Sequence, residues 1–534
     1  MNKYLKIYFV TALMTTSFSC TNLDVDIKSQ YTSYPDSEIA LEAKMADIYY
    51  SFAKSLGNWY MVFSSLSSDE YSGVHLGSDY WDNGVYFHPS VHAYSPDDMS
   101  LAHYADLASA VTKCNCIIQD LGGEENPNCA PAIAMRAFYN FILMDSYGAI
   151  PILDRLPDDD ERIEREPRSK VVKFIESDLL KAIDNLPTVV DASTYGKPTR
   201  WMAAALLVKL YINWGVYSCD DVTTYTETTQ NPKLDECIKW CDEIIGSGLF
   251  DLSNSYREKF WPNNGPHIKD FIYAMPYDCY NNKGMFYSRY RTWRKGNNDG
   301  EGGPSYYGTV LNNSVAGIFA LNPEMVDLFC LKGDDRNEVI IRDTIFMYDP
   351  VTYQKTKQPY LYKGSPVVLT KDIKIIDNTL DVGNDVNGWS QGYRSIKWWP
   401  SADAYNAGRN QENDVPIFRY ADVLLMKAEA ILRGGKATDG DTPASLMNQI
   451  RSYVHAPLVS EKVSLQDILD ERGREFLDEN WRRNDLIRFN KFEEDWGYKN
   501  ILNPKAKTNK NLRIIPIPTD IMNKNVNWKQ NPGY

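Results

Sequence analysis

Helical segments bounded by capping residues and glycines recur at both ends of this chain of 534 residues. Thr199 precedes an alanine-rich apolar run over 201–214, and Pro131 opens another run that closes at Gly148. A side-chain oxygen before a helix accepts an otherwise unpaired backbone N–H, and glycine ends a helix because it tolerates positive φ. The repeated order of cap, helix and short turn predicts antiparallel helices packed in pairs.

The same signals predict further helices along the chain. They cover 99–121, 234–245, 420–433, a segment from Thr442-Pro443, and a segment capped by Ser464 and Asp467. The capping residues of the first are expected in Ser95-Pro96-Asp97-Asp98. Since no strict 34-residue period is present, stacking is inferred from the order of helices and turns. The predicted fold is mainly α, a tetratricopeptide-like scaffold of helical pairs.

The middle of the chain has a different pattern. Between 250 and 415, Gly, Asn and Pro are frequent, helical periodicity is weak, and short β-prone pieces such as Val339-Ile340-Ile341 stand between turns. This pattern predicts a loop-rich insertion containing short strands, and so long an irregular segment is normally functional. The insertion separates a helical part over 31–249 from a second over 416–534.

The first nineteen residues have the pattern of an export signal. Lys3 and Lys6 precede an apolar run that is too short to span a bilayer as a helix. Cys20 follows directly, so residues 1–19 resemble a bacterial lipoprotein leader, in which the thiol of Cys20 is acylated, for example with palmitate. Residues 20–30 would then be a polar tether. The alternative is an ordinary secreted protein with a chance cysteine.

Charge and composition narrow the class of ligand. The formal net charge is −14, so nucleic acid is an unfavourable partner for the average surface. The chain has 36 Tyr against 19 Phe, together with 13 Trp. Because a buried phenol needs a hydrogen-bond partner, this excess of tyrosine indicates that some rings face a ligand.

Several motifs occur in a fixed order behind the leader. They are RAFYNFILMDSYGAIP at 136–151, GKPTRWMAAA at 196–205, FRYADVLLMKAEA at 418–430, the Arg/Glu-rich stretch 471–488, and the ending IPIP at 515–518 with QNPGY at 530–534. Together they resemble the SusD/RagB family of outer-membrane nutrient-binding lipoproteins. Between 206 and 417 we find no family motif.

The resemblance implies a location and a partner. Members of the family sit on the outer membrane by a lipid anchor, here Cys20, and face the cell exterior as a lid over a SusC-like TonB-dependent transporter. They capture oligosaccharides or, in RagB-like members, peptides, and bind them without cleavage or cofactor. The charged residues of 471–488 and Glu429 are expected to form structural ion pairs rather than a ligand site.

A sugar ring needs flat aromatic faces for its C–H groups and polar side chains for its hydroxyls. Three segments supply both: 59–94, 286–307 and 389–405. We predict the ligand contacts in the first two segments, at Tyr80, Trp81, Asn83, Tyr290 and Trp293. The alternative is that these rings only fix long loops to the scaffold.

Enzymatic and metal-binding alternatives have weaker support. The sequence has no nucleophile elbow, phosphate-binding glycine loop or zinc-protease motif, so no catalytic residue is predicted. A glycoside hydrolase needs only two suitably spaced carboxylates and stays an open alternative. The pairs Cys114/Cys116 and Cys237/Cys241 lack further zinc ligands nearby, and 297–301 lacks the full calcium-loop pattern.

Overall fold

The computed structural model describes most of the chain after the leader. The described residues are 38–77, 84–158, 160–287, 293, 305–308, 317–401, 409–460 and 462–534. The predicted leader, Cys20 and the tether lie outside them. Residues 45–534 form one compact unit.

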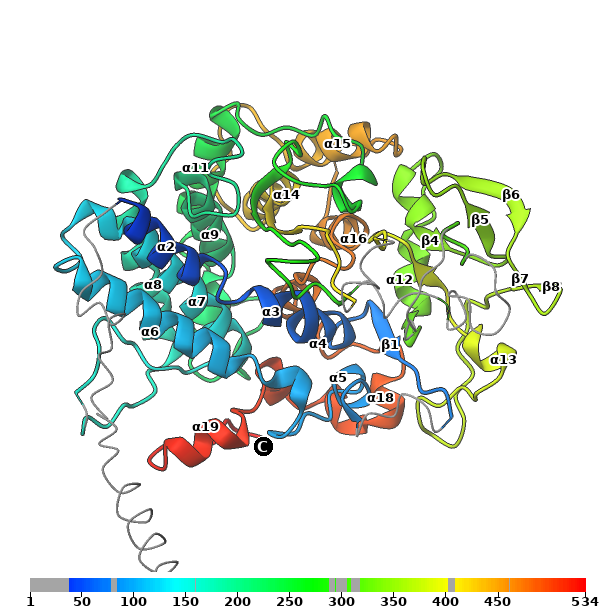
Figure 1. Ribbon diagram of the computed structural model, residues 1–534, viewed down its shortest axis with the longest axis horizontal. Helices are drawn as coiled ribbons and strands as arrows, with labels where there is room; N and C mark the ends of the chain where they lie inside the picture. The colour runs from blue at the N-terminus through cyan, green and yellow to red at the C-terminus, as the bar shows by residue number, and fades with distance from the viewer. Residues whose placement is uncertain are drawn as a thin grey trace, which may run out of the picture. The chain divides into compact units, whose positions relative to one another are not determined.

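The predicted helices of the first half form, and successive helices pack on each other (Figure 1). Short elements come first: α2 (Glu38–Tyr49), α3 (Ala53–Ser55), a π-helical turn (Leu56–Tyr60), α4 (Met61–Leu66) and α5 (Phe87–Ser90). The longer helices are α6 (Tyr104–Asp120), α7 (Ala130–Tyr147), α8 (Arg168–Ala182), α9 (Arg200–Ile212) and α11 (Leu234–Gly246), with the short α10 (Trp214–Tyr217). α6 packs on α7, α7 on α8, and α9 on α11.

Capping residues and glycines correctly predicted the start of α9 and the end of α7. The Thr199 hydroxyl accepts the backbone N–H of Met202 at 3.2 Å, so it caps α9 as predicted. Gly148 ends α7 with a φ of +77°. The three alanines 203–205 are buried, where their small side chains let neighbouring helices approach closely.

The predicted start of the helix over 99–121 is wrong. Met99–Leu101 form a 3₁₀ turn, and the α-helix begins only at Tyr104. The carboxylate of Asp98 accepts the backbone N–H of Ser95 at 2.7 Å and contacts Nδ1 of His88 at 2.6 Å. Asp98 therefore makes the predicted bond to Ser95 and also contacts a histidine of α5, but the turn that it closes leads into a 3₁₀ turn and not directly into the α-helix.

The second helical part packs around its own apolar cluster. It contains α14 (Tyr420–Leu432), α15 (Pro443–Tyr453), α16 (Leu465–Glu475), α17 (Arg482–Arg488), α18 (Lys499–Leu502) and α19 (Thr519–Lys524). Leu424, Leu446 and Ile468 bring α14, α15 and α16 together in this cluster. Capping boxes at Thr442 and Ser464 start α15 and α16, as predicted.

Short antiparallel strands lie mainly in and beside the insertion. The pairs are β1 (Tyr71–Gly73) with β3 (Phe319–Leu321), β2 (Phe271–Met275) with β10 (Val415–Arg419), β4 (Ile340–Ile341) with β9 (Arg394–Ser395), β5 (Phe346–Tyr348) with β6 (Lys355–Pro359), and β7 (Leu361–Tyr362) with β8 (Ser365–Pro366). Two short helices, α12 (Pro323–Leu328) and α13 (Val386–Trp389), complete it. Because β2 pairs with β10, the chain enters and leaves the insertion at neighbouring strands.

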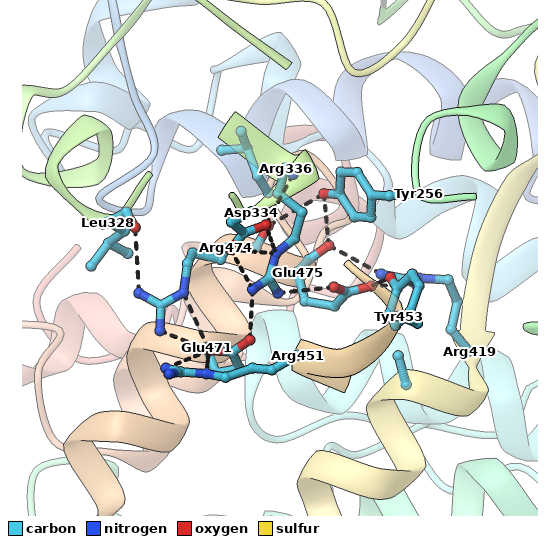
Figure 2. Close-up of polar contacts among 12 residues, drawn as sticks. Tyr256, Leu328, Asp334, Arg336, Arg419, Arg451, Tyr453, Glu471, Arg474 and Glu475 are labelled. Atoms are coloured by element: carbon cyan, nitrogen blue, oxygen red, sulfur yellow. Dashed lines mark hydrogen bonds and ion pairs between the residues drawn. The ribbon is translucent and has the colours of Figure 1, made fainter. Parts of the chain in front are cut away.

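Charged side chains of the C-terminal motif pair in the interior (Figure 2). Glu471 on α16 lies 2.7 Å from Arg336, 3.0 Å from Arg451 and 2.8 Å from Arg474. All four side chains are at least nine-tenths buried. Burial by itself would raise the pKa of Glu471, but the three guanidinium groups overcome it and hold the pKa at about 2.

Glu475, one turn along α16, joins the same network (Figure 2). It pairs with Arg419 at 2.8 Å and Arg336 at 3.1 Å, and accepts the hydroxyl of Tyr453 at 2.5 Å. Glu429 is likewise buried, and lies 2.8 Å from Arg488. The prediction that these motif residues are structural is confirmed: they join α14, α15, α16 and α17 to the insertion.

Candidate functional site

The three aromatic segments predicted from the sequence meet in space. The backbone N–H of Phe286 donates to the carbonyl of Gly57 at 2.9 Å, so the second segment runs beside the start of the first. The second and third segments meet where Trp293 packs edge-on against Trp389, with ring centroids 6.1 Å apart. Segments that are far apart in the sequence thus share one region.

Rings between the first two segments are mostly buried. Phe319 on β3 contacts Tyr71, Tyr86 and Tyr287, with ring centroids 5.7 to 6.3 Å apart. The hydroxyls of Tyr71 and Tyr287 donate to the two carboxylate oxygens of Asp478 at 3.0 and 2.8 Å. These rings hold loops to the scaffold, which is the alternative that the sequence left open.

Trp293 is also buried. Its indole has no exposed surface, and it packs edge-on against Tyr360, Tyr362 and Trp389. The indole N–H donates to the hydroxyl of Ser390 at 3.4 Å. Trp293 therefore supports the rings around it from behind, and a direct ligand contact for it stays a prediction.

The other four predicted contacts, Tyr80, Trp81, Asn83 and Tyr290, lie outside the described residues. Their part in ligand binding also stays a prediction. Gly77 and Gly84 flank three of them, and the main chain at Gly77 is fixed by a 2.9 Å hydrogen bond to Asp381 of the insertion. Gly77, which precedes them in the sequence, is therefore tied to the insertion.

A pocket of about 660 Å³ is lined by the β7–β8 hairpin and by residues of and beside α13. We call it the α13 pocket, and it is lined by residues within 362–370 and 384–391. Figure 1 shows where the hairpin and α13 lie. Tyr362 and Trp389 supply its rings, with centroids 5.8 Å apart and planes at 79°. Asn384, Asp385 and Asn387 supply exposed amide and carboxylate groups.

Local sequence positions the two rings. Lys363 and Gly364 both have positive φ, 49° and 76°, as a two-residue type I′ hairpin requires, and the hairpin places Tyr362 at the end of β7. Asp385 caps α13 by accepting the N–H of Gly388 at 2.9 Å. The Trp389 indole donates to Asn384 at 3.0 Å, which fixes the plane of the ring.

Arg394 fixes the turn behind α13. It is fully buried and donates to the carbonyls of Trp389, Gln391 and Gly392 at 3.2, 2.8 and 2.6 Å. Burial lowers the pKa of Arg394 to about 10, so it stays charged at neutral pH. The rigid turn gives the pocket a preformed wall, which reduces the entropy lost on binding.

The α13 pocket has the chemistry that a sugar requires. Its two rings offer faces or edges to C–H groups, and its amides and carboxylate can bond hydroxyls. Its volume is in the usual range for ligand sites. Trp389 lies in the third predicted aromatic segment, 389–405, in which we predicted no ligand contact. Tyr362 was not predicted. The signal that could have indicated it is the pair of tyrosines in Tyr360-Leu-Tyr362, directly before the Lys-Gly turn.

Comparisons with known proteins agree with this architecture. The sequence model described as "SusD family" matches residues 269–534, and a second, described as "Starch-binding associating with outer membrane", matches residues 23–212. The chain belongs to the SusD family. The first SusD match begins inside the insertion, so it extends well beyond the motifs that the sequence alone revealed.

Individual SusD relatives are distant in sequence. The chain is 24% identical over 434 residues to the starch-binding protein SusD of Bacteroides thetaiotaomicron, covering 75% of this chain and 71% of that protein. It resembles the structure of a laminarin-binding SusD-like protein with a TM-score of 0.67 and 20% identity, covering 93% of this chain and all of the other.

A further similar structure is surface glycan-binding protein A of Bacteroides thetaiotaomicron in complex with laminarihexaose. The TM-score is 0.66 at 19% identity, and the match covers 92% of this chain and 99% of that one. These likenesses establish a shared fold and confirm the predicted SusD-type helical scaffold. Among the described helices, none is both long and apolar enough to span a membrane.

Proposed function

We propose that this SusD-family chain is an outer-membrane glycan-binding protein that captures oligosaccharides for uptake. The observation that carries the proposal is the α13 pocket, where Tyr362 and Trp389 stand beside amide and carboxylate groups on a preformed turn. Family membership and the starch and laminarin ligands of similar proteins support a glycan as the ligand. The chain binds its ligand and does not cleave it.

The proposal includes the remaining parts predicted from the sequence. Cys20 carries the lipid, the protein faces the cell exterior, and a SusC-like TonB-dependent transporter receives the ligand. Tyr80, Trp81, Asn83 and Tyr290 contact the ligand as well, and Trp293 supports the rings of the pocket.

Calorimetry with laminarihexaose and with a starch-derived hexasaccharide tests the ligand class. We expect Trp389→Ala and Tyr362→Ala to weaken binding by at least tenfold, because each removes a ring from the pocket. Trp81→Ala tests the contact predicted at that residue in the same way. Tyr280→Ala is the matched control, because Tyr280 is 68% exposed and lies outside the pocket.

Unchanged affinity in folded Trp389 and Tyr362 variants would remove the α13 pocket from the proposal. A reducing-end assay on the same incubations separates binding from hydrolysis. New reducing ends would favour the glycoside hydrolase alternative, whereas binding without product supports a capture protein.

A further inference from the structure

A second cavity, separate from the α13 pocket, lies beside strands β4, β5 and β6 of the insertion. Its volume is about 730 Å³, and we call it the basic cavity. Its walls come from Arg257, from residues 329–333 and from the stretch 337–355, including β4 and β5. It shares no lining residue with the α13 pocket.

The charge in this cavity is opposite to that of the chain. Four cationic residues line it, Arg257, Lys332, Arg342 and Lys355, against the single acid Glu338. The whole protein has a formal net charge of −14. In a concave site the fields of neighbouring charges add, so the cavity attracts anions although the average surface repels them.

Arg257 carries a buried charge without a close partner. Its side chain is 10% exposed, and its nearest carboxylate oxygen, on Glu338, is 3.9 Å away on a side chain that is 62% exposed. The Nη2 atom has no hydrogen-bond partner within the described part of the chain. Burial lowers the pKa of Arg257, with a small opposing effect from Tyr348 and Glu338. A buried guanidinium normally pairs with a carboxylate or another anion. Because Arg257 also lines the cavity, an oxyanion bound there would compensate part of its charge.

The other cations are available as well. Lys332 and Lys355 are exposed and form no ion pair with the described residues, and Lys355 Nζ lies 5.8 Å from the centre of the Phe346 ring. Arg342 donates to the carbonyl of Phe329 and forms no ion pair with the described residues. The apolar wall, which includes Ile340 and Phe346, suits the C–H face of a sugar.

We infer that the basic cavity is a second ligand site, which binds a glycan through an oxyanion substituent, either a uronic-acid carboxylate or a sulfate ester. The inference rests on the proposed function for the glycan that carries the charge. The oxyanion requirement itself comes from the four cations and the cavity. The chain would therefore hold a charged polysaccharide at two places, by rings in the α13 pocket and by charge here.

Calorimetry with hexasaccharides of three kinds tests this site: an oligogalacturonide, a sulfated oligosaccharide and neutral laminarihexaose. We expect Arg257→Gln to weaken binding of a charged probe at least tenfold and to leave the neutral probe unchanged. Binding of the charged probe should also weaken as salt rises. The oligogalacturonide and the sulfated probe distinguish the carboxylate from the sulfate ester. Lys505→Gln, an exposed lysine outside both cavities, is the charge-matched control.

Two further experiments keep the proposal testable if the Arg257 variant fails to fold. The double variant Lys332→Gln/Lys355→Gln changes only exposed side chains and should give the same selective loss. Of the eight described cysteines, Cys330 alone is exposed, and it lines the cavity. The charged probe should therefore slow alkylation of Cys330 by iodoacetamide, and the neutral probe should not.

The outcomes separate the two proposals. Failure of both charged probes to bind, or equal binding to wild type and all basic-cavity variants, overturns the basic cavity while leaving neutral binding at the α13 pocket intact. Charged binding that depends on Arg257, with no neutral binding, supports the basic cavity and counts against the α13 pocket.

Discussion

At the scale of single residues, Asp414 is a buried carboxylate that titrates near neutrality. It accepts the N–H of Tyr277 at 2.7 Å and the hydroxyl of Tyr195 at 2.8 Å, and no cation forms an ion pair with it among the described residues. Burial raises its pKa to about 7, although the two hydrogen bonds oppose the rise. Asp278 is the neighbouring charge that also raises it.

Because this pKa is raised on folding, Asp414 stabilises the fold most at low pH and destabilises it as pH rises from about 4 through 7. We expect Asp414→Asn to remove that loss, so the variant gains stability relative to wild type by on the order of 4 kcal/mol between pH 4 and pH 8. Urea unfolding at several pH values measures the difference. Asp97→Asn, at an exposed aspartate, should show no such trend; a constant difference for Asp414→Asn would contradict the assignment.

Gly388 in α13 is closely packed, so a larger side chain at this position tests whether the position of α13 matters for binding. A Cβ at this position would meet the carbonyl oxygens of Val382 and Gly383, which pass directly beside α13. Gly388→Ala must therefore displace α13 and Trp389 with it. We expect a loss of about 1 to 3 kcal/mol in stability, as for overpacking elsewhere, together with weaker glycan binding.

Thermal unfolding and calorimetry measure both effects. Gly246→Ala is the matched control, because a Cβ at the end of α11 meets no atom within 4 Å. A Gly388→Ala variant that binds and unfolds like wild type would show that α13 can shift without moving the ring.

At the scale of elements, the buried ion pairs decide how the fold responds to acid. The pKa values of Glu471, Glu475 and Asp485 are each about 2, because nearby arginines outweigh the cost of burial. Depressed carboxylate pKa values stabilise the fold at neutral pH, and this stability is lost as pH falls from about 4.5 through 2. We therefore expect cooperative acid unfolding in that range.

Glu475→Gln tests the network that joins α16 to the insertion. It leaves Arg336 and Arg419 with less negative charge in a buried site, so we expect a loss of about 3 to 5 kcal/mol at pH 7 and a shallower dependence on acid. Glu494→Gln, at a largely exposed ion pair, is the control and should cost less than about 1 kcal/mol. Circular dichroism with urea at pH 7 and pH 3 measures both variants, and equal losses in the two would contradict the role of the network.

At the scale of the whole molecule, the proposed lipid anchor and the proposed transporter partner can be tested in one experiment. We expect Cys20→Ser to release the protein from the membrane fraction of its native host, because one sulfur would carry the whole anchor. Wild-type protein extracted in mild detergent should co-purify with a SusC-like barrel. Mass spectrometry of both fractions measures the lipid and the partner; an unmodified Cys20 in membrane-bound protein would contradict the anchor.

Sequence and structure agree most closely where the determining contacts are local. Thr199, Thr442 and Ser464 each cap a helix through a hydrogen bond to a residue three positions later, so a short stretch of sequence suffices to predict them. The predicted bond between Ser95 and Asp98 also forms, but the α-helix that it was expected to start begins only at Tyr104, after a 3₁₀ turn. The local signal marks the turn and does not fix where α-helical bonding begins.

Because caps, periodicity and motifs act within a few residues, the sequence was enough to predict most of the long helices, the family resemblance and the structural role of the charged C-terminal motif. It did not predict α8 or the start of α6. Which aromatic rings line a pocket, and which pack wholly in the interior, depends on the tertiary structure. Tyr362, Trp389 and Trp293 come together because the strand pairs fold the insertion back on itself, and the four cations of the basic cavity meet for the same reason. Contacts between distant segments depend on how the whole core packs, and a linear pattern does not contain that packing.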